Sequence, residues 1–587
     1  MPRLTHLLLV SAVIFIVALT APLNASFMRT ASAQSEPVTL YSIGDQVASF
    51  DPQIAADDVS ITPVTNMFIG LTDMDPKTSN IRPAAATKWE KNAAGDVWTF
   101  TLRDDIPWVH WDPTTQQATE VRKLVAGDFE YGIKRACDPR LGGLYTKVAA
   151  AIVKGCDVVA NLDPGNIQDS DFDQIGVKAT SDTELQITTQ GPLPFFMYTT
   201  AMWMFRAVPR ETIDQFGDQW TAPGNIVVDG PYMLDQFDPA VSRSFVKNPL
   251  FPADVFDTYG GNIERINVTV VNDAGTAYSL YQNNEIDAVG APQGEIDKIR
   301  SDPELSKQLI QRTELVVGYF GFMYDKKPFN DVHVRRAFSA AIDRNTYVSE
   351  VLIGRGLPIA HFMPPGIRGS VGINEVQVGD PSNPGFDPIY AKQELAAAGF
   401  PDCKGFPTFT ILTAAPQDAE FLQNEITTNL GCDQSIVNIE QTEGTVLLQA
   451  IKPDVPTAQR PGIFSEGWGA DYPDAQNWMH DVLSCHSEND FKRPCNDIDK
   501  EIEQATHELD PQKRDALYRD IEGKFFAKDG EFPIAPLAVS VDISLVKPWY
   551  QGQFQTDGMF GGSHWNTRVI DQAQQLAARS KSGATGR

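Results

Sequence analysis

The chain of 587 residues has little positive charge and little cysteine for its length. Lys and Arg number 48 against 76 Asp and Glu, which gives a formal net charge of -28 at pH 7. A nucleic acid requires a basic surface that replaces its counterions, and an anionic membrane surface attracts clustered Lys and Arg. The excess of acid therefore argues against both partners. It leaves a small ligand that is cationic, zwitterionic or neutral.

The sequence signatures of catalysis are also missing. No GxSxG elbow, HExxH, GxGxxG or Walker loop occurs. Residues 169–180 begin like a calcium loop, but Gln174 and Thr180 stand where such a loop needs Gly and Glu. A group of neighbouring His and Cys residues lacks the zinc spacings, namely His480, Cys485 and His486. We therefore expect no catalytic residue, no metal site and no cofactor.

Long apolar runs are absent after the first segment. Arg3 is followed by an uncharged apolar stretch over residues 7–21, and a small-x-small tripeptide ends at Ala33. The stretch is short for a membrane helix, which needs about 20 residues. We expect a secretory signal peptide, residues 1–33, cleaved after Ala33, with an uncleaved anchor as the alternative. Since no cysteine precedes Cys137, a lipoprotein anchor is excluded and the protein is expected to be periplasmic or otherwise extracytoplasmic.

Export changes the interpretation of the six cysteines. They fall into three pairs that are close in the sequence, and an oxidising compartment favours disulfides over metal ligation. The predicted bonds are Cys137–Cys156, Cys403–Cys432 and Cys485–Cys495.

Strands and helices alternate along the chain, which predicts the α/β class. Residues 97–102 and 184–188 alternate like half-buried strands. A strand at 266–271, a helix at 274–282 and a strand at 286–289 predict a parallel pair with a crossover.

Two helices carry start signals. After Asp331, apolar residues recur at helical spacing as far as Leu352, and Gly354 ends the pattern. Asp510 precedes a proline and a second helix, in which a buried stripe is expected at every fourth residue, namely Leu517, Ile521 and Phe525.

The most informative segment is residues 467–478. Its glycines and its proline favour a loop, yet Trp468, Tyr472 and Trp478 surround one carboxylate, Asp471. Such a cluster suits a cation such as an α-amino group, through Coulomb attraction and cation–π contact. The alternative is a buried loop in which the aromatics belong to the core and Asp471 caps backbone amides.

Segment 467–478 and nine further segments, in the same order along the chain, resemble one family. It is family 5 of the extracytoplasmic solute-binding proteins, the peptide- and nickel-binding proteins of ABC importers, and the likeness is strongest to the oligopeptide-binding proteins. The nine segments are Ala48–Pro52, Phe68–Leu71, Ala86–Trp89, Trp98–Asp104, Asp229–Leu234, Lys247–Pro249, Asn284–Asp287, Lys327–Ala337 and Ala341–Arg344.

The resemblance implies an α/β fold like that of the type II periplasmic binding proteins. Two lobes would close over the ligand about a hinge of two crossing strands, and lobe 1 would carry an extra subdomain. The crossings are expected near Val317 and near Phe532-Pro533. The implied boundaries are 34–78, 192–316 and 535–587 for lobe 1, 79–191 for its subdomain and 317–534 for lobe 2.

The resemblance also implies roles for site residues. In the family's oligopeptide binders, the Asp of an Ala-Asp-Tyr motif pairs with the N-terminal amine of the peptide, and Asp471 matches it. Trp468, Tyr472 and Trp478 are expected around the ligand. A second stretch matches the segment whose backbone pairs with an extended peptide as an added strand, namely Gln46, Val47 and Ala48.

The sequence departs from the family pattern at two places. Where well-known oligopeptide binders have an Arg that helps to hold a peptide carboxylate, this chain has a position close to Ser465, followed by Glu466. With Glu466 and Asp471 both acidic, we expect peptides of basic character and assign Glu466 to the site. The stretch from His110 to Leu124 is longer than the family's usual turn and is expected to reshape one wall of the cleft.

The expected function is therefore that of an exported, monomeric binding protein that captures oligopeptides and delivers them to the permease subunits of an ABC importer. The first alternative keeps the fold but exchanges the ligand for a nickel chelate, a glycoside or another small solute. The second alternative is a secreted hydrolase that uses carboxylates distant from one another in the sequence, although no sequence motif indicates one.

Overall fold

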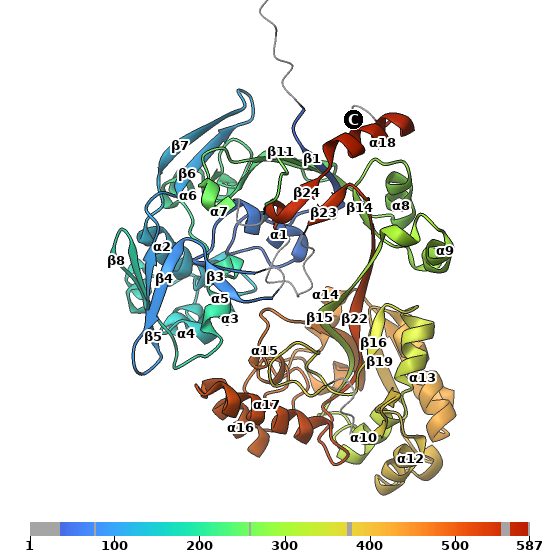
Figure 1. Cartoon of the computed structure of the whole chain (residues 1–587). Coiled ribbons are helices and arrows are strands. Elements are labelled where there is room, and N and C mark those ends of the chain that lie inside the picture. The colour runs from blue at the N-terminus through green and yellow to red at the C-terminus, as the bar shows by residue number, and fades with distance from the viewer. Residues whose placement is uncertain (1–35, 76–77, 257–259, 373–377, 553–563, 585–587) are drawn as a thin grey trace, which may run out of the picture. The chain divides into compact units, whose positions relative to one another are not determined.

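The largest sheet of the described residues is built around two long strands, β15 (Leu309–Phe322) and β22 (Ile534–Val546). They pair antiparallel from Leu309 opposite Leu545 to Gly321 opposite Ile534, and Figure 1 shows them as two long strands side by side, β15 in green and β22 in red. The strand order is β14 (Ala288–Gly290), β22, β15, β21 (Ile463–Gly469), β19 (Phe409–Thr413) and β20 (Val437–Gln441), with β16 (Gly356–Pro358) also on β22.

This computed structural model describes residues 36–587 except 76–77, 257–259, 373–377, 553–563 and 585–587. The predicted signal peptide, residues 1–33, lies outside the described residues. Val38–Arg587 forms one compact unit. Among the helices in the described ranges, none has the length and apolar character that a membrane crossing requires.

Three smaller sheets contain most of the remaining strands. The first has the order β1 (Thr39–Gly44), β13 (Arg265–Val270), β12 (Ser242–Lys247) and β11 (Tyr232–Asp238). The second has the order β4 (Ala86–Lys91), β5 (Val97–Leu102), β9 (Glu184–Thr188) and β8 (Val177–Ser181). The third has the order β10 (Val227–Val228), β6 (Pro107–Asp112) and β7 (Gln117–Lys123).

Three two-stranded sheets and a set of helices complete the described fold. The paired strands are β2 (Thr72–Met74) with β3 (Ile81–Pro83), β17 (Gly379–Asp380) with β18 (Asn383–Pro384) and β23 (Tyr550–Gly552) with β24 (Arg568–Ile570). The helices are α1 (Asp58–Met67), α2 (Ala126–Ala136), α3 (Thr146–Ile152), α4 (Cys156–Ala160), α5 (Phe196–Thr199), α6 (Arg210–Phe216), α7 (Ala253–Phe256), α8 (Ala274–Gln282), α9 (Ile296–Ser301), α10 (Val332–Ala340), α11 (Arg344–Thr346), α12 (Pro388–Ala397), α13 (Pro416–Leu430), α14 (Gly444–Ala450), α15 (Gln476–Met479), α16 (Asp497–His507), α17 (Pro511–Phe526) and α18 (Gln572–Ser582).

Several predicted elements are confirmed, and one predicted pairing is wrong. β5, β9 and α8 have the expected bounds. However, β13 and β14 belong to different sheets: β13 pairs in parallel with β1, and β14 pairs with β22. The order strand–helix–strand does not require the two strands to be neighbours in one sheet. Here β1, from the start of the described chain, is the parallel neighbour of β13.

The helix predicted after Asp331 is interrupted. Asp331 caps α10 as expected, accepting from the backbone N–H of His333 at 2.9 Å. The helix ends at Ala340, because Asp343 begins a new one by accepting from the N–H of Thr346. α17 follows the prediction in part: Asp510 caps its first turn and Ile521 and Phe525 are buried, but Leu517, the first residue of the predicted stripe, is only half-buried.

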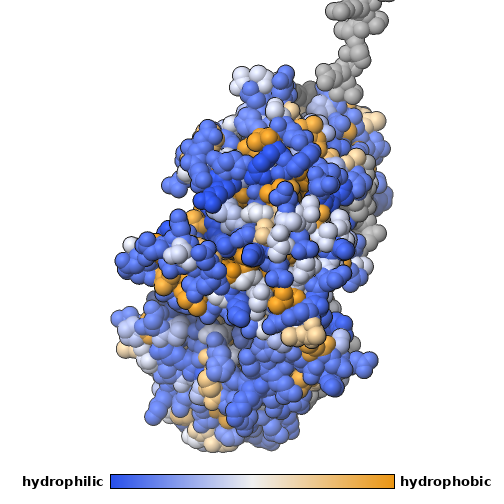
Figure 2. Space-filling model, turned by 90° about the vertical axis from the view of Figure 1, so that its left-hand side faces the viewer, coloured by the Kyte–Doolittle hydropathy of each residue, from blue (hydrophilic) through white to orange (hydrophobic). Residues whose placement is uncertain are grey.

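The six cysteines pair as predicted, in the bonds Cys137–Cys156, Cys403–Cys432 and Cys485–Cys495. The stretch between His110 and Leu124 forms the β6–β7 hairpin, whose edge strand β7 is largely exposed. The acidic stretch 169–174 is a 3₁₀ turn with no buried residue. Figure 2 shows a mostly hydrophilic face on which hydrophobic residues form small separate patches, as the acidic composition predicts.

Candidate ligand-binding site

A cavity of about 700 Å³ collects four of the residues that the sequence selects, namely Glu466, Trp468, Asp471 and Tyr472. Its walls come from three parts of the chain: α3 with residues 190–195, the strands β15 and β21, and the segment from Asp471 to the end of α16. A larger, open groove of about 1040 Å³ lies beside α17 and contains none of the predicted site residues. The first cavity is therefore the candidate site.

Asp471 lies on the loop after β21 and is 6% exposed. Tyr145, which precedes α3, donates its hydroxyl hydrogen to Oδ1 at 2.8 Å, and Nδ2 of Asn477 donates to Oδ2 at 3.2 Å. Burial raises the pKa of Asp471 to about 6, although both hydrogen bonds favour the ionised form. At neutral pH the side chain is thus a carboxylate with little water around it, which attracts a cation.

Asn477 and Arg514 hold the Asp471 loop in place. Oδ1 of Asn477 accepts from the backbone N–H of Asp471 at 2.8 Å and from Nε1 of Trp468 at 3.3 Å. Arg514 on α17 makes two hydrogen bonds to the carboxylate of Asp474, at 2.6 and 2.7 Å. Within the described residues the Asp471 carboxylate accepts from the side chains of Tyr145 and Asn477, and these contacts differ from the alternative role as a cap of backbone amides.

The three aromatic residues of the segment occupy different places. Tyr472 lines the cavity and stacks on Phe195, with ring centroids 5.3 Å apart and planes 4° apart. Trp468 also lines the cavity. Trp478 is completely buried against Phe362, with ring centroids 5.0 Å apart, and does not line the cavity. Trp478 supports the site from the core, so its predicted contact with ligand stays a prediction.

Strand alternation explains the positions of Glu466 and Ser465. Side chains two apart on a strand face the same side, and Glu466 and Trp468 both line the cavity. Ser465 faces the other side, where its hydroxyl donates to Asp418 at 2.9 Å. Ser465 therefore does not line this cavity, while its acidic neighbour Glu466 does.

Burial shapes the electrostatics of Glu466. Its Oε2 accepts from the hydroxyl of Tyr319 at 2.9 Å. Burial raises the pKa of Glu466 to about 7, and the negative charge of Asp490 acts in the same direction.

Gly321 on β15 leaves room for the neighbouring Phe464 ring, because a Cβ at residue 321 would lie 2.3 Å from a ring carbon.

The segment predicted to pair with a peptide backbone does not line the cavity. Gln46 and Ala48 are exposed, and Val47 is buried. The backbone N–H of Ala48 already donates to the hydroxyl of Ser60 at 3.1 Å. Strand addition at these residues stays a prediction, and it requires this N–H to be released.

Four contacts join residues 145–195 to residues 471–507 around the cavity. Two were described above, the Tyr145–Asp471 hydrogen bond and the Phe195–Tyr472 stack. The third is an ion pair between Lys147 and Glu488 at 2.6 Å. In the fourth, Nδ1 of His507 lies 3.1 Å from the carbonyl oxygen of Pro192.

Several of these residues have no local signal in the sequence. Tyr145 lies 326 residues from Asp471 in the chain, and no motif surrounds Lys147, Glu488 or Asp490. Asn477 is different, because it belongs to the informative segment. Its place four residues before a second carboxylate, Asp481, could have indicated a side chain that bridges the two acids, as its Nδ2 does.

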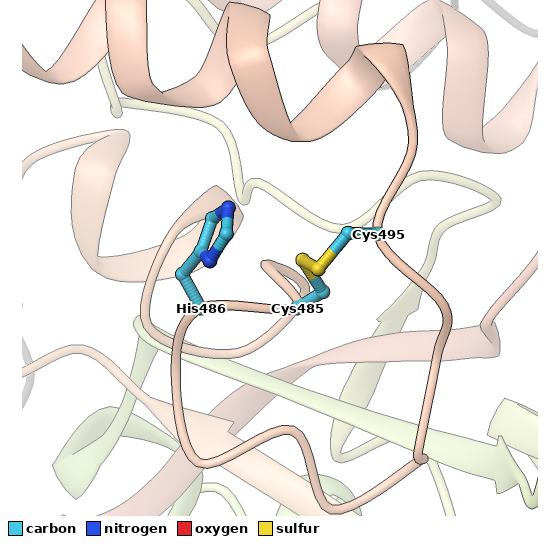
Figure 3. A group of neighbouring side chains, drawn as sticks. All are labelled: Cys485, His486 and Cys495. Carbon is cyan, nitrogen blue, oxygen red and sulfur yellow. A yellow bond between two sulfur atoms is a disulfide. The ribbon is translucent and has the colours of Figure 1, made fainter.

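One group of potential metal ligands occurs in the described part of the chain, Cys485, His486 and Cys495. Figure 3 shows that the two sulfur atoms are bonded to each other, with the imidazole of His486 beside them. Since metals bind the thiolate form of cysteine, the disulfide leaves one ligand of the three. The group does not form a metal site in this state, and the sequence-based preference for a disulfide is confirmed.

The model of the bacterial extracellular solute-binding proteins, family 5 (middle), matches residues 80–490. The chain belongs to this family. Membership agrees with the prediction of a binding protein rather than an enzyme.

Two relatives of this family 5 protein show how far the likeness extends. It is 28% identical to the periplasmic oligopeptide-binding protein OppA of Salmonella typhimurium, over 88% of this chain and 90% of that protein. It is 27% identical, over the same shares, to the probable deoxycholate-binding periplasmic protein YgiS of Escherichia coli.

The mixed α/β fold matches solved structures of such proteins. The murein tripeptide binding protein MppA of Escherichia coli superposes with a TM-score of 0.71 at 25% identity, covering 91% of this chain and 99% of that chain. The oligopeptide-binding protein OppAIV of Borrelia burgdorferi gives a TM-score of 0.71 at 23% identity, covering 90% and 99%. The predicted α/β class is confirmed.

Proposed function

We propose that this family 5 protein captures peptides in the 700 Å³ cavity and delivers them to the permease subunits of an ABC importer. The observation that carries the proposal is the buried carboxylate of Asp471 on the cavity wall. The α-ammonium group of a peptide carries a positive charge, which pairs with this carboxylate, and several N–H groups, which donate hydrogen bonds to it. Such charge-assisted hydrogen bonds are strong in a site with little water.

We further propose that the cavity closes between two lobes. Lobe 1 comprises 34–78, 192–316 and 535–587, its subdomain 79–191, and lobe 2 comprises 317–534. The pairing of β15 with β22 supports this division, because both proposed crossings fall on or beside these strands and their register shifts between Thr313 and Val317. Opening would break the four contacts around the cavity, and ligand would favour the closed state only by the difference in its affinity for the two states.

We also propose that the protein is exported from the cytoplasm. A binding protein that serves an importer acts outside the cytoplasm, so residues 1–33 would be removed as a signal peptide and the mature chain would act as a monomer. The periplasmic location in the names of the OppA, MppA and YgiS relatives supports this address.

The charge of the cavity lining favours peptides over deoxycholate, the ligand named for the YgiS relative. Deoxycholate is an anion, and six carboxyl groups against one lysine line the cavity. These carboxylates would repel an anionic steroid, whereas they attract the ammonium group of a peptide. The cavity therefore favours peptides over bile-acid anions.

Native mass spectrometry of the protein purified from its exporting host tests the ligand class. We expect bound species whose masses form a series of short peptides and which disappear after denaturation and refolding. A single steroid, sugar or metal-chelate mass in their place would contradict the peptide proposal and support the small-solute alternative.

A further inference from the structure

The carboxylates Glu466, Glu488 and Asp490 of the cavity wall have different charged neighbours from Asp471. Lys452, which follows α14, forms an ion pair with Glu488, and Lys147 of α3 binds the same carboxylate at 2.6 Å. Both lysines are hydrogen-bonded to Glu488, and their charges also act on Asp490. The next carboxylate, Asp490, lies 4.0 Å from Lys452, beyond hydrogen-bond distance.

Asp490 also has an acceptor atom without a donor. Its Oδ1 is buried and has no hydrogen-bond partner in the described structure. The side chain as a whole is 23% exposed and lines the cavity. A buried acceptor without a donor costs free energy, which a donor brought by the ligand would recover.

The loop that carries Asp490 is held firmly. The Cys485–Cys495 disulfide closes it, and the ring of the next residue, Phe491, stacks on Phe464 with centroids 5.6 Å apart. The guanidinium of Arg460 donates to the backbone carbonyl of Asp490. The backbone at Asp490 is thus held in place before any ligand arrives, which reduces the entropic cost of binding.

The charge of Asp490 acts on Glu466. Burial raises the pKa of Glu466 to about 7, and the negative charge of Asp490 contributes to the rise. Burial also raises the pKa of Asp490 to about 6, with Glu488 acting in the same direction and the cations Lys452, Arg460 and Lys147 acting against it. Among the described residues, the hydrogen-bond donor to Glu466 is the neutral hydroxyl of Tyr319.

The cavity, rather than the carboxylates alone, marks this region as a binding site. Tyr319, Phe464 and Phe491 line it together with the two acids. Aromatic rings of this kind pack against the methylene groups of a long side chain and attract its cationic end. A basic side chain needs both an apolar wall and a carboxylate.

We propose that Glu466 and Asp490 form a second subsite, which binds the cationic side chain of a lysine or arginine residue in the peptide. The inference rests on the proposed function, because it specifies which peptides the cavity takes. Asp471 follows Glu466 by five positions, so the Cα atoms of the two residues lie at most about 18 Å apart. A peptide of a few residues can therefore reach both subsites at once.

Calorimetry with matched peptides tests the subsite. The peptides are alanine tetrapeptides with a single lysine at the second, third or fourth position, and the same peptides with norleucine, which keeps the aliphatic chain without the charge. We expect the wild-type protein to prefer lysine at one position by about tenfold or more.

Three variants identify the residues responsible. Glu466→Gln keeps an acceptor for Tyr319 and should reduce the lysine preference to about threefold or less, since the amide cannot take the negative charge that a bound cation would stabilise on Glu466. The double variant Glu466→Gln/Asp490→Asn should abolish the preference. Glu440→Gln, on the exposed side of β20 in the same sheet, should leave it unchanged.

The possible outcomes separate the two proposals. If the peptides bind but lysine and norleucine are equivalent at every position, the subsite is wrong and the peptide function stands. If the preference persists in the double variant, the cation binds elsewhere and the subsite is also wrong. If no peptide binds, the proposed function fails and the subsite fails with it.

Discussion

The carboxylates on the cavity wall differ in their hydrogen bonds. Asp471 is surrounded by hydrogen-bond donors from the protein, with Tyr145 on one oxygen and Asn477 on the other. Among the described residues, a buried oxygen of Asp490 has no hydrogen-bond donor, and Glu466 accepts from one neutral hydroxyl. Hydrogen-bond donors from the protein orient a carboxylate. A carboxylate oxygen without such a donor is an unsatisfied acceptor, to which a ligand can donate a hydrogen bond.

This difference separates affinity from selectivity. Every peptide with a free N-terminus carries an ammonium group, so a well-oriented Asp471 would bind peptides regardless of sequence. Only some peptides carry a basic side chain, so Glu466 and Asp490 would select among them. The predictions below test this division of roles.

The largest effect is expected at the oriented end. Asp471→Asn should weaken binding of lysine and norleucine peptides alike by about 100-fold, on the order of 3 kcal/mol, because the buried charge pair is lost. The melting temperature without ligand should change little, since an ionised and buried carboxylate is replaced by a neutral amide. Isothermal titration and thermal unfolding measure the two quantities. A loss of affinity confined to the lysine peptides would show that Asp471 selects among peptides, which would contradict the roles assigned to Asp471 and to the Glu466–Asp490 pair.

The second effect is a pH dependence of peptide binding. The pKa of Asp471 is raised to about 6 by burial, with Asp481 contributing to the rise. An ammonium group stabilises the carboxylate form, so protons compete with peptide as the pH falls through about 6. The affinity for an all-alanine peptide should therefore fall about tenfold between pH 7 and pH 5, since each pH unit below the free pKa costs one factor of ten. A constant affinity over this range would exclude Asp471 from the amine site.

The disulfide near Asp490 offers a third test. Replacing both cysteines, Cys485→Ser with Cys495→Ser, should lower the free energy of unfolding by about 2–3 kcal/mol, because a loop with a sequence separation of 10 is no longer closed. The lysine preference should fall as Asp490 becomes less fixed, while the affinity for alanine peptides should remain. The double serine replacement Cys403→Ser/Cys432→Ser, far from the cavity in sequence, is the control. Equal effects of both pairs on the lysine preference would contradict the role of the Asp490 loop.

The smallest effect concerns the donor to Asp471. Tyr145→Phe removes the hydroxyl that donates to Oδ1 and should raise the pKa of Asp471, because a hydrogen bond to the charged form is lost. The pH profile of peptide binding should shift upward, with an affinity change of about threefold or less at pH 7. An unshifted profile would show that this hydrogen bond does not orient the carboxylate in solution.

The sequence predicts one wall of the site and misses the other. Asp471, Tyr472, Trp468 and Glu466 belong to one continuous segment, whose glycines and aromatics can be recognised locally. Tyr145 and Lys147 approach them only because the chain folds back over more than 300 residues. No local pattern specifies that approach.

The same limit applies to the fold. Periodicity places β5, β9 and α8 correctly, because burial of alternate or fourth residues is a local property. It does not show that β13 pairs with β1, since pairing partners are chosen by the whole sheet. The cysteine pairs are predictable because each pair is close in sequence and the compartment is oxidising.

The most direct test of the central claim compares one alanine tetrapeptide with its N-acetylated form on the wild-type protein. Acetylation removes the positive charge at the N-terminus and leaves the rest of the peptide intact. We predict that the acetylated peptide binds about 100-fold more weakly to the wild type, and that the two peptides differ by less than about threefold on Asp471→Asn. Equal affinities of the free and acetylated peptides for the wild-type protein would contradict the assignment of Asp471 as the residue that binds the amine.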